Sequence, residues 1–82
     1  MLTLDRALVL NTLIKHETLT LQDLAKKENL GLVPDAFYFR QLIQQLLNDA
    51  CIETLNGTEE PTYTITSKGI AEGKRMELSI DK

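Results

Sequence analysis

The strongest constraint on the fold is a run of apolar residues in the middle of the chain, spaced as on one side of an α-helix. Its members are Phe39, Leu42, Ile43, Leu46, Leu47 and Ala50. Spacings of three and four place all of them on one stripe, which must be buried. Pro34 and Asp35 precede the run, and Asp35 suits a cap or a first-turn position. The sequence therefore predicts an amphipathic helix that ends near Ala50.

Two shorter helical patterns come before this helix. The first runs from Leu4 to Lys15 and places Asp5 in its first turn, while the second begins after Thr20, a good N-cap residue. Asn29 or Gly31 can take the left-handed conformation that ends the second helix. A short extended piece, residues 18–19, is expected between the two patterns.

Two strands and a loop follow. Residues 52–55 form the first predicted strand, and residues 62–66 form the second, in which polar and apolar side chains alternate. Asn56-Gly57 is a turn signal because both residues tolerate positive φ. Pro61 has no N–H to donate, so we expect it in the loop or at a strand start.

A last helix is predicted after Thr66 or Ser67, since either side chain can cap it. Gly69 and Gly73 lower its intrinsic stability by about 1 kcal/mol each relative to alanine. We therefore expect this helix to depend on packing against the body or a partner.

This order resembles the winged-helix superfamily, because two helices joined by a turn are followed by a hairpin and a helix. The segment 63–69, Tyr-Thr-Ile-Thr-Ser-Lys-Gly, resembles the Tyr-x-Leu-Thr-x-Lys-Gly segment of small bacterial PadR-like and MarR-like regulators. Residues 18–25 resemble their strand-to-second-helix junction. The resemblance implies one α+β domain over residues 1–82, with a three-helix core, a two-stranded wing and a C-terminal helix. The link from Asn29 to Asp35 is longer than a standard helix-turn-helix turn, which leaves the helix angle open.

The resemblance also implies DNA binding, with the third helix in the major groove. The residues expected to contact DNA are Lys26, Lys27, Tyr38, Arg40, Gln41, Gln44, Gln45, Asn48 and Lys68. Amide side chains can bond adenine, and arginine can bond guanine. The alternative is that these residues are only the solvated side of an amphipathic helix, and that the lysines serve solubility.

Charge weighs against DNA. The whole chain carries a net charge of −3, and the predicted wing contains Glu53, Glu59 and Glu60. DNA affinity comes largely from cations that displace counterions, so an acidic wing would be repelled. The rival interpretation is a protein-interaction or assembly module, or a homodimer seam. Its candidate residues are Phe37, Met76, Leu78 and Ile80. Leu30, Leu32 and Val33 are further apolar residues that lie in the predicted link.

Catalysis, cofactors and metals find no support in the sequence. His16 is the single histidine and stands where it complements a helix dipole. Glu59 and Glu60 are neighbours on a loop and do not converge on one substrate atom. Cys51 is the single cysteine, so no disulfide or cysteine-based zinc site is possible within one chain, and we expect it to be buried. We therefore expect no enzyme and no cofactor.

Neither a signal peptide nor a membrane span is expected. The N-terminus lacks a basic stretch followed by an apolar run, and no apolar segment approaches the roughly 18 residues of a span. The hydrophobic fraction of 43 % is typical of a globular domain. The sequence thus predicts a cytoplasmic protein.

Overall fold

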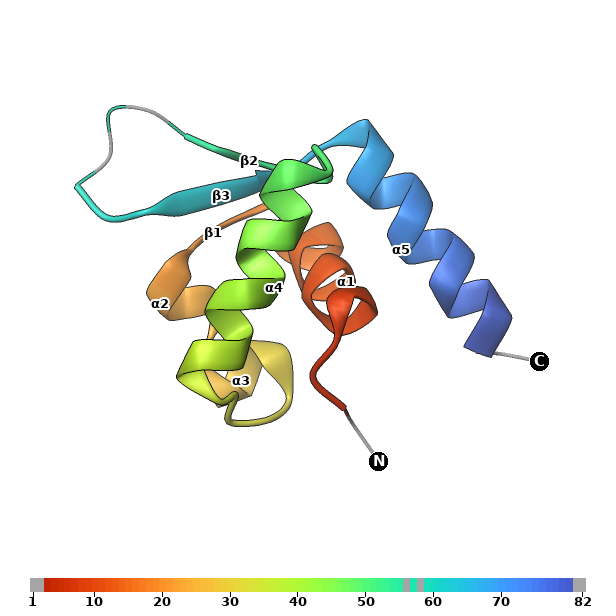
Figure 1. The fold of residues 1–82 in the computed structure, drawn as a ribbon, viewed down its shortest axis with the longest axis horizontal. Helices are drawn as coiled ribbons and strands as arrows, with labels where there is room; N and C mark the ends of the chain where they lie inside the picture. The colour runs from red at the N-terminus through yellow and green to blue at the C-terminus, as the bar shows by residue number, and fades with distance from the viewer. Residues whose placement is uncertain (1–2, 56, 58, 81–82) are drawn as a thin grey trace.

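The computed structural model describes residues 3–55, 57 and 59–80, and for residues 76–80 it describes the backbone alone (Figure 1). Helices and one small sheet make up this part of the chain, and the α+β prediction is confirmed. In order they are α1 (Arg6–His16), β1 (Thr18–Thr20), α2 (Leu21–Leu24), α3 (Lys27–Leu30), α4 (Ala36–Asn48), β2 (Ile52–Thr54), β3 (Thr62–Ile65) and α5 (Ser67–Ile80).

Side chains just outside four of the helices accept hydrogen bonds from their first turns. Asp35 accepts from the Tyr38 backbone N–H at 2.9 Å, so its predicted capping role is confirmed. The cap of α1 is Asp5, which lies one position before the helix and not in its first turn as predicted. The other two caps are Thr20 for α2 and Thr66 for α5. Each cap satisfies a backbone donor that has no partner within its helix.

The predicted second helix is broken into α2 and α3. Lys26 between them has an extended backbone, and the Asn29 side chain donates to the Asp23 carbonyl at 2.8 Å. In one continuous helix Leu30 would lie about 240° around the axis from Leu24 and face away from the core. The break instead buries Leu30 to 2 % exposure, which corrects its assignment to the link. Gly31, with φ of 92°, ends α3 in the predicted left-handed conformation.

The sheet is antiparallel, with strand order β1-β3-β2. Ile52 of β2 stands opposite Ile65 of β3, so the predicted hairpin is confirmed. Residues 18–20, of which 18–19 were predicted as a short extended piece, form a third strand along the other edge of β3. In the loop, Asn56 lies outside the described residues, and Gly57 has the positive φ that a turn requires, 81°.

The core is made mostly of leucine and isoleucine, which come from the first four helices and from β2. Four members of the predicted stripe on α4 are buried: Phe39, Leu42, Ile43 and Leu46. Leu47 is half-buried against them. Ala50 is exposed beyond the end of the helix with φ of 62°, so its place on the buried stripe was wrong. Cys51 is fully buried, as predicted.

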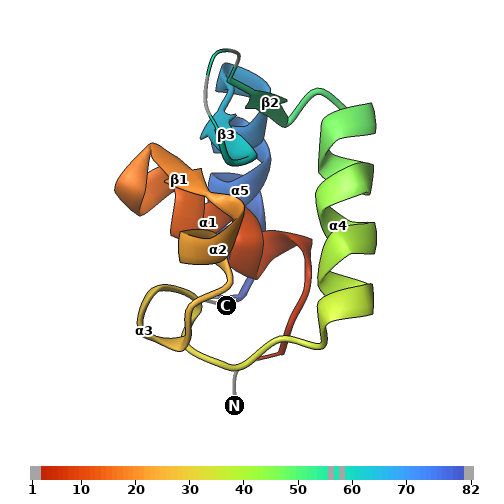
Figure 2. The same ribbon diagram turned by 90° about the vertical axis from the view of Figure 1, so that its left-hand side faces the viewer.

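The glycines of α5 allow this helix to approach its neighbours closely. A Cβ at Gly69 would overlap the carbonyl oxygen of Cys51, and one at Gly73 would lie 2.8 Å from Cδ1 of Ile14. Helix α5 therefore packs along α1, while α4 stands apart on the other side of α1 (Figures 1 and 2).

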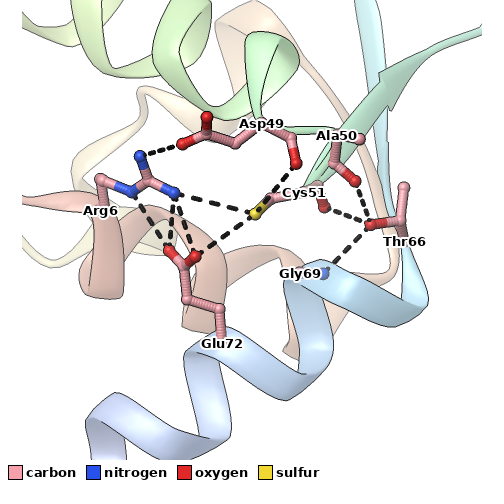
Figure 3. A network of polar contacts seen from close by, with 7 residues as sticks. All are labelled: Arg6, Asp49, Ala50, Cys51, Thr66, Gly69 and Glu72. Carbon is pink, nitrogen blue, oxygen red and sulfur yellow. Dashed lines mark hydrogen bonds and ion pairs between the residues drawn. The ribbon is translucent and has the colours of Figure 1, made fainter.

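A network of polar contacts links the start of α1, the residues just after α4, and the first half of α5 (Figure 3). The Arg6 guanidinium of α1 contacts Glu72 of α5 at 2.8 Å through Nη2 and at 3.1 Å through Nε, and it also pairs with Asp49. Burial, then the nearby Glu72 carboxylate, raises the pKa of the Cys51 thiol within the same network. Thr66 Oγ1 donates to the carbonyls of Ala50 and Cys51 at 2.7 and 2.9 Å. The start of α5 is thus held to the end of α4.

Candidate nucleic-acid interface

Helix α4 carries six of the nine residues that the sequence analysis predicts to contact DNA. It forms one side of the molecule in Figure 2, with its apolar stripe turned inward. The predicted residues of this helix are all exposed: Tyr38, Arg40, Gln41, Gln44, Gln45 and Asn48. Their side chains do not form one flat surface, because they spread over about 160° around the helix axis.

The middle of this face is a row that we call the outer stripe, made of Phe37, Gln41, Gln44 and Asn48. These residues are spaced by four, three and four positions, so they lie one above another on the helix surface. No member is charged. Gln44 Nε2 donates to Asn48 Oδ1 at 3.1 Å, which orders two of the amides relative to each other.

The other three α4 residues predicted to contact DNA lie on the two flanks of the outer stripe. Arg40 lines a mostly apolar groove together with Leu21 and Gln22 of α2. Tyr38 and Gln45 line a depression on the opposite flank, beside the start of α1. The sequence placed these residues on one face, whereas the structure separates them into an uncharged centre and two edges.

The three lysines predicted to contact DNA are exposed but do not lie together. Lys26 pairs with Asp23 at 3.1 Å, and this hydrogen bond lowers the pKa of the Asp23 carboxyl. Lys27 begins α3, on the same side of the molecule as α2. Lys68 lies in the first turn of α5, at the other end of the sheet from α2 (Figure 1). The segment that holds Lys26 and Lys27 therefore lies near the start of α4, whereas the first turn of α5, with Lys68, lies far from it.

The wing is acidic where it is described. Glu53, Glu59 and Glu60 are all exposed on β2 and the loop. Carboxylates repel phosphate groups, so these three wing residues are not candidates for contact with a DNA backbone.

The apolar candidates for an interface come from two helices, α4 and α5. Phe37 is 73 % exposed on the outer stripe, and Val33 just before α4 is 77 % exposed. Met76, Leu78 and Ile80 are in the second half of α5, and their side chains lie outside the described part of the chain. Helix α1 stands between α4 and α5 (Figure 1).

Neither a metal site nor a membrane-spanning helix is found in the part of the chain that the structure describes. Among the described residues, no group of histidine, cysteine, aspartate and glutamate side chains is arranged to hold a metal ion. Within the same residues, every helix is too short or too polar to cross a bilayer.

Comparison with known proteins identifies the fold. No family model matches the sequence, and no curated protein matches it. Among solved structures, F93 from STIV, described as a winged-helix DNA-binding protein, superposes with a TM-score of 0.82 at 18 % identity, over 93 % of this chain and 86 % of that one. F-93 of SSV1 superposes with a TM-score of 0.77 at 21 % identity, over 99 % and 91 % of the two chains.

A larger regulator shares the same architecture. BpsR of Bordetella bronchiseptica, whose structure addresses how 6-hydroxynicotinic acid regulates its DNA binding, superposes with a TM-score of 0.77 at 19 % identity. The match covers 98 % of this chain and 60 % of that one. The predicted winged helix-turn-helix fold is confirmed, with β2 and β3 paired as the predicted two-stranded hairpin.

Proposed function

We propose that this chain is a DNA-binding protein of the transcriptional-regulator type, in which α4 enters the major groove. The observation that carries the proposal is the solvent-exposed polar face of α4 within a winged-helix fold. That face offers amide, guanidinium and phenol groups, which are the groups that bond base edges and phosphates. F93 from STIV, described as DNA-binding, has this fold.

The residues divide into three roles under this proposal. The outer stripe faces the base edges, because it is the part of α4 that projects furthest from the core. Arg40 and Tyr38, one on each flank, contact phosphates on the two sides of the groove. Lys26 and Lys27 extend the contact on the α2–α3 side. Lys68 of α5 contacts a phosphate further from α4.

A homodimer is part of the proposal, because one copy offers few cations. Lys26, Lys27, Arg40 and Lys68 give at most about four phosphate contacts, so the slope of log affinity against log salt is at most about 4 per protomer. Two protomers on one duplex double the contacts and set a half-site spacing. Light scattering at micromolar concentration measures this state, and a strict monomer contradicts the dimer.

The test is a salt-dependent titration of a random duplex by fluorescence anisotropy. Binding at about 50 mM salt should weaken steeply by about 200 mM. Arg40→Ala should lower the slope by about 1. Lys74→Ala, an exposed lysine of α5 with no assigned role, removes the same charge and should leave the slope unchanged.

The absence of binding at the lower salt would reject the proposal. A protein-assembly role would then gain support, since Val33 and Phe37 are the most exposed apolar side chains among the described residues. Equal slopes for Arg40→Ala and Lys74→Ala would show that Arg40 does not contact a DNA phosphate.

A further inference from the structure

The outer stripe of α4 combines three side-chain amides with one exposed phenyl ring and carries no charge. It extends for about 16 Å along the helix, the length of roughly five stacked base pairs. We propose that this stripe reads A·T base pairs, with its amides on adenine and Phe37 on the 5-methyl group of thymine. The inference rests on the proposed DNA-binding function and adds to it the class of sequence that is bound.

The amides match adenine and not guanine. In the major groove adenine presents one acceptor, N7, and one donor, N6, whereas guanine presents two acceptors. A carboxamide has one donor group and one acceptor, so it pairs with adenine at both atoms. Reading guanine in the same way requires two donors on one side chain, as in arginine.

The hydrogen bond between two of the amide side chains supports this role. Gln44 uses one of its two amide hydrogens in the bond to Asn48. Its carbonyl oxygen and second hydrogen stay available for one adenine, and Asn48 keeps its own NH2 group. A side chain already held in one orientation loses less conformational freedom on binding.

Arg40 is the single cation of α4, and it lies at the edge of the outer stripe. It lines the groove beside Leu21 and Gln22, toward α2. This position suits a phosphate on the wall of the major groove better than a base at its centre. The stripe that faces the bases therefore lacks the group that specifies guanine.

Phe37 supplies the apolar half of the recognition. Its side chain is 73 % exposed in the first turn of α4, so it contributes little to the core. Apolar contact with the thymine methyl is an established means of distinguishing thymine in the major groove. Removing one methyl from such a contact should weaken binding about fourfold.

The experiment selects duplexes from a random-sequence pool with the wild-type chain at low salt and then replaces the thymines of the selected duplex with uracil. We expect A·T-rich selected sequences and about fourfold weaker binding for each contacted methyl that uracil lacks. Phe37→Ala should bind the two duplexes equally. Val33→Ala, which truncates an equally exposed apolar residue outside α4, should keep the preference for thymine.

Each failure has a separate meaning. Selection of G·C-rich sequences, no selected sequence at all, or equal binding of the thymine and uracil duplexes by the wild type would overturn the inference while duplex binding stands. A thymine preference that survives Phe37→Ala would remove Phe37 from the recognition and overturn it as stated. No duplex binding at low salt would overturn the proposed function and this inference together.

Discussion

Alanine at Gly69 is expected to destabilise the protein, although alanine is the better helix former. A Cβ at this position would overlap the Cys51 carbonyl oxygen and would lie 2.8 Å from Cδ1 of Ile65. The carbonyl is a backbone group and cannot rotate away. It also accepts hydrogen bonds from Thr66, from the backbone N–H at 3.1 Å and from Oγ1 at 2.9 Å. The Cβ fits only if α5 moves away from residue 51.

The size of the effect follows from two opposing terms. Replacing glycine by alanine inside a helix gains about 1 kcal/mol. Overpacking costs about 1–3 kcal/mol, and weakening the two bonds to the buried Cys51 carbonyl adds about 1–3 kcal/mol. We expect a net loss of about 1–5 kcal/mol in the free energy of unfolding. For a chain of this size the melting temperature then falls by about 4 °C or more.

Circular dichroism melts and urea titrations measure this loss, and two further variants serve as controls. Gly73→Ala should have a much smaller effect, because the nearest atom is Cδ1 of Ile14, the far end of a flexible side chain. Ala71→Gly, at an exposed position of α5, should lose about 1 kcal/mol from helix propensity alone. A Gly69→Ala protein that melts at or above the wild-type temperature would refute the packing argument.

Three other predictions concern the polar network and its surroundings. Glu72→Gln should lower the free energy of unfolding by about 1–3 kcal/mol, because the Glu72 side chain is 14 % exposed and its carboxylate pairs with Arg6. Asp49→Asn should lower it by less than about 1 kcal/mol, because the Asp49 side chain is 48 % exposed. Equal losses in urea titrations would contradict the argument from burial. Ala50→Gly should raise stability by a few tenths to about 1 kcal/mol, because Ala50 is exposed with φ of 62° and glycine adopts this conformation without steric cost; a lower melting temperature would show that the strain is absent. The Cys51 thiol should react slowly with a thiol reagent at neutral and mildly alkaline pH and rapidly in urea, since burial raises its pKa in the folded state. With the folded pKa above the unfolded one, the thiol's contribution to stability is present below the unfolded pKa and is lost as the pH rises through the folded pKa; rapid labelling of the native protein would contradict both statements.

The candidate site was partly predictable from the sequence. The exposed side of α4 follows from the positions left over by its apolar stripe, and the structure leaves all six predicted residues exposed. The outer stripe also follows from the spacing of its members along the helix. The surroundings of the two flanks were not predictable in this way, because they depend on which elements stand beside the helix, α2 near Arg40 and α1 near Tyr38 and Gln45.

Sequence by itself determined the local features of this protein. The stripe on α4, the caps at Thr20 and Asp35, the turn at Gly31 and the hairpin each follow from residues within a few positions of one another. Local spacing suffices there, because helix periodicity, capping and turn geometry act over one or two turns of chain.

Tertiary structure decided the rest. It broke the second helix so that Leu30 could be buried, and it added β1 to the sheet. It also used Gly69 and Gly73 for close packing, and it brought Arg6 to Glu72 across 66 positions of sequence. These outcomes depend on contacts between distant segments. The energy of such contacts is set by shape and burial in the assembled core, which leaves no periodic trace in the chain.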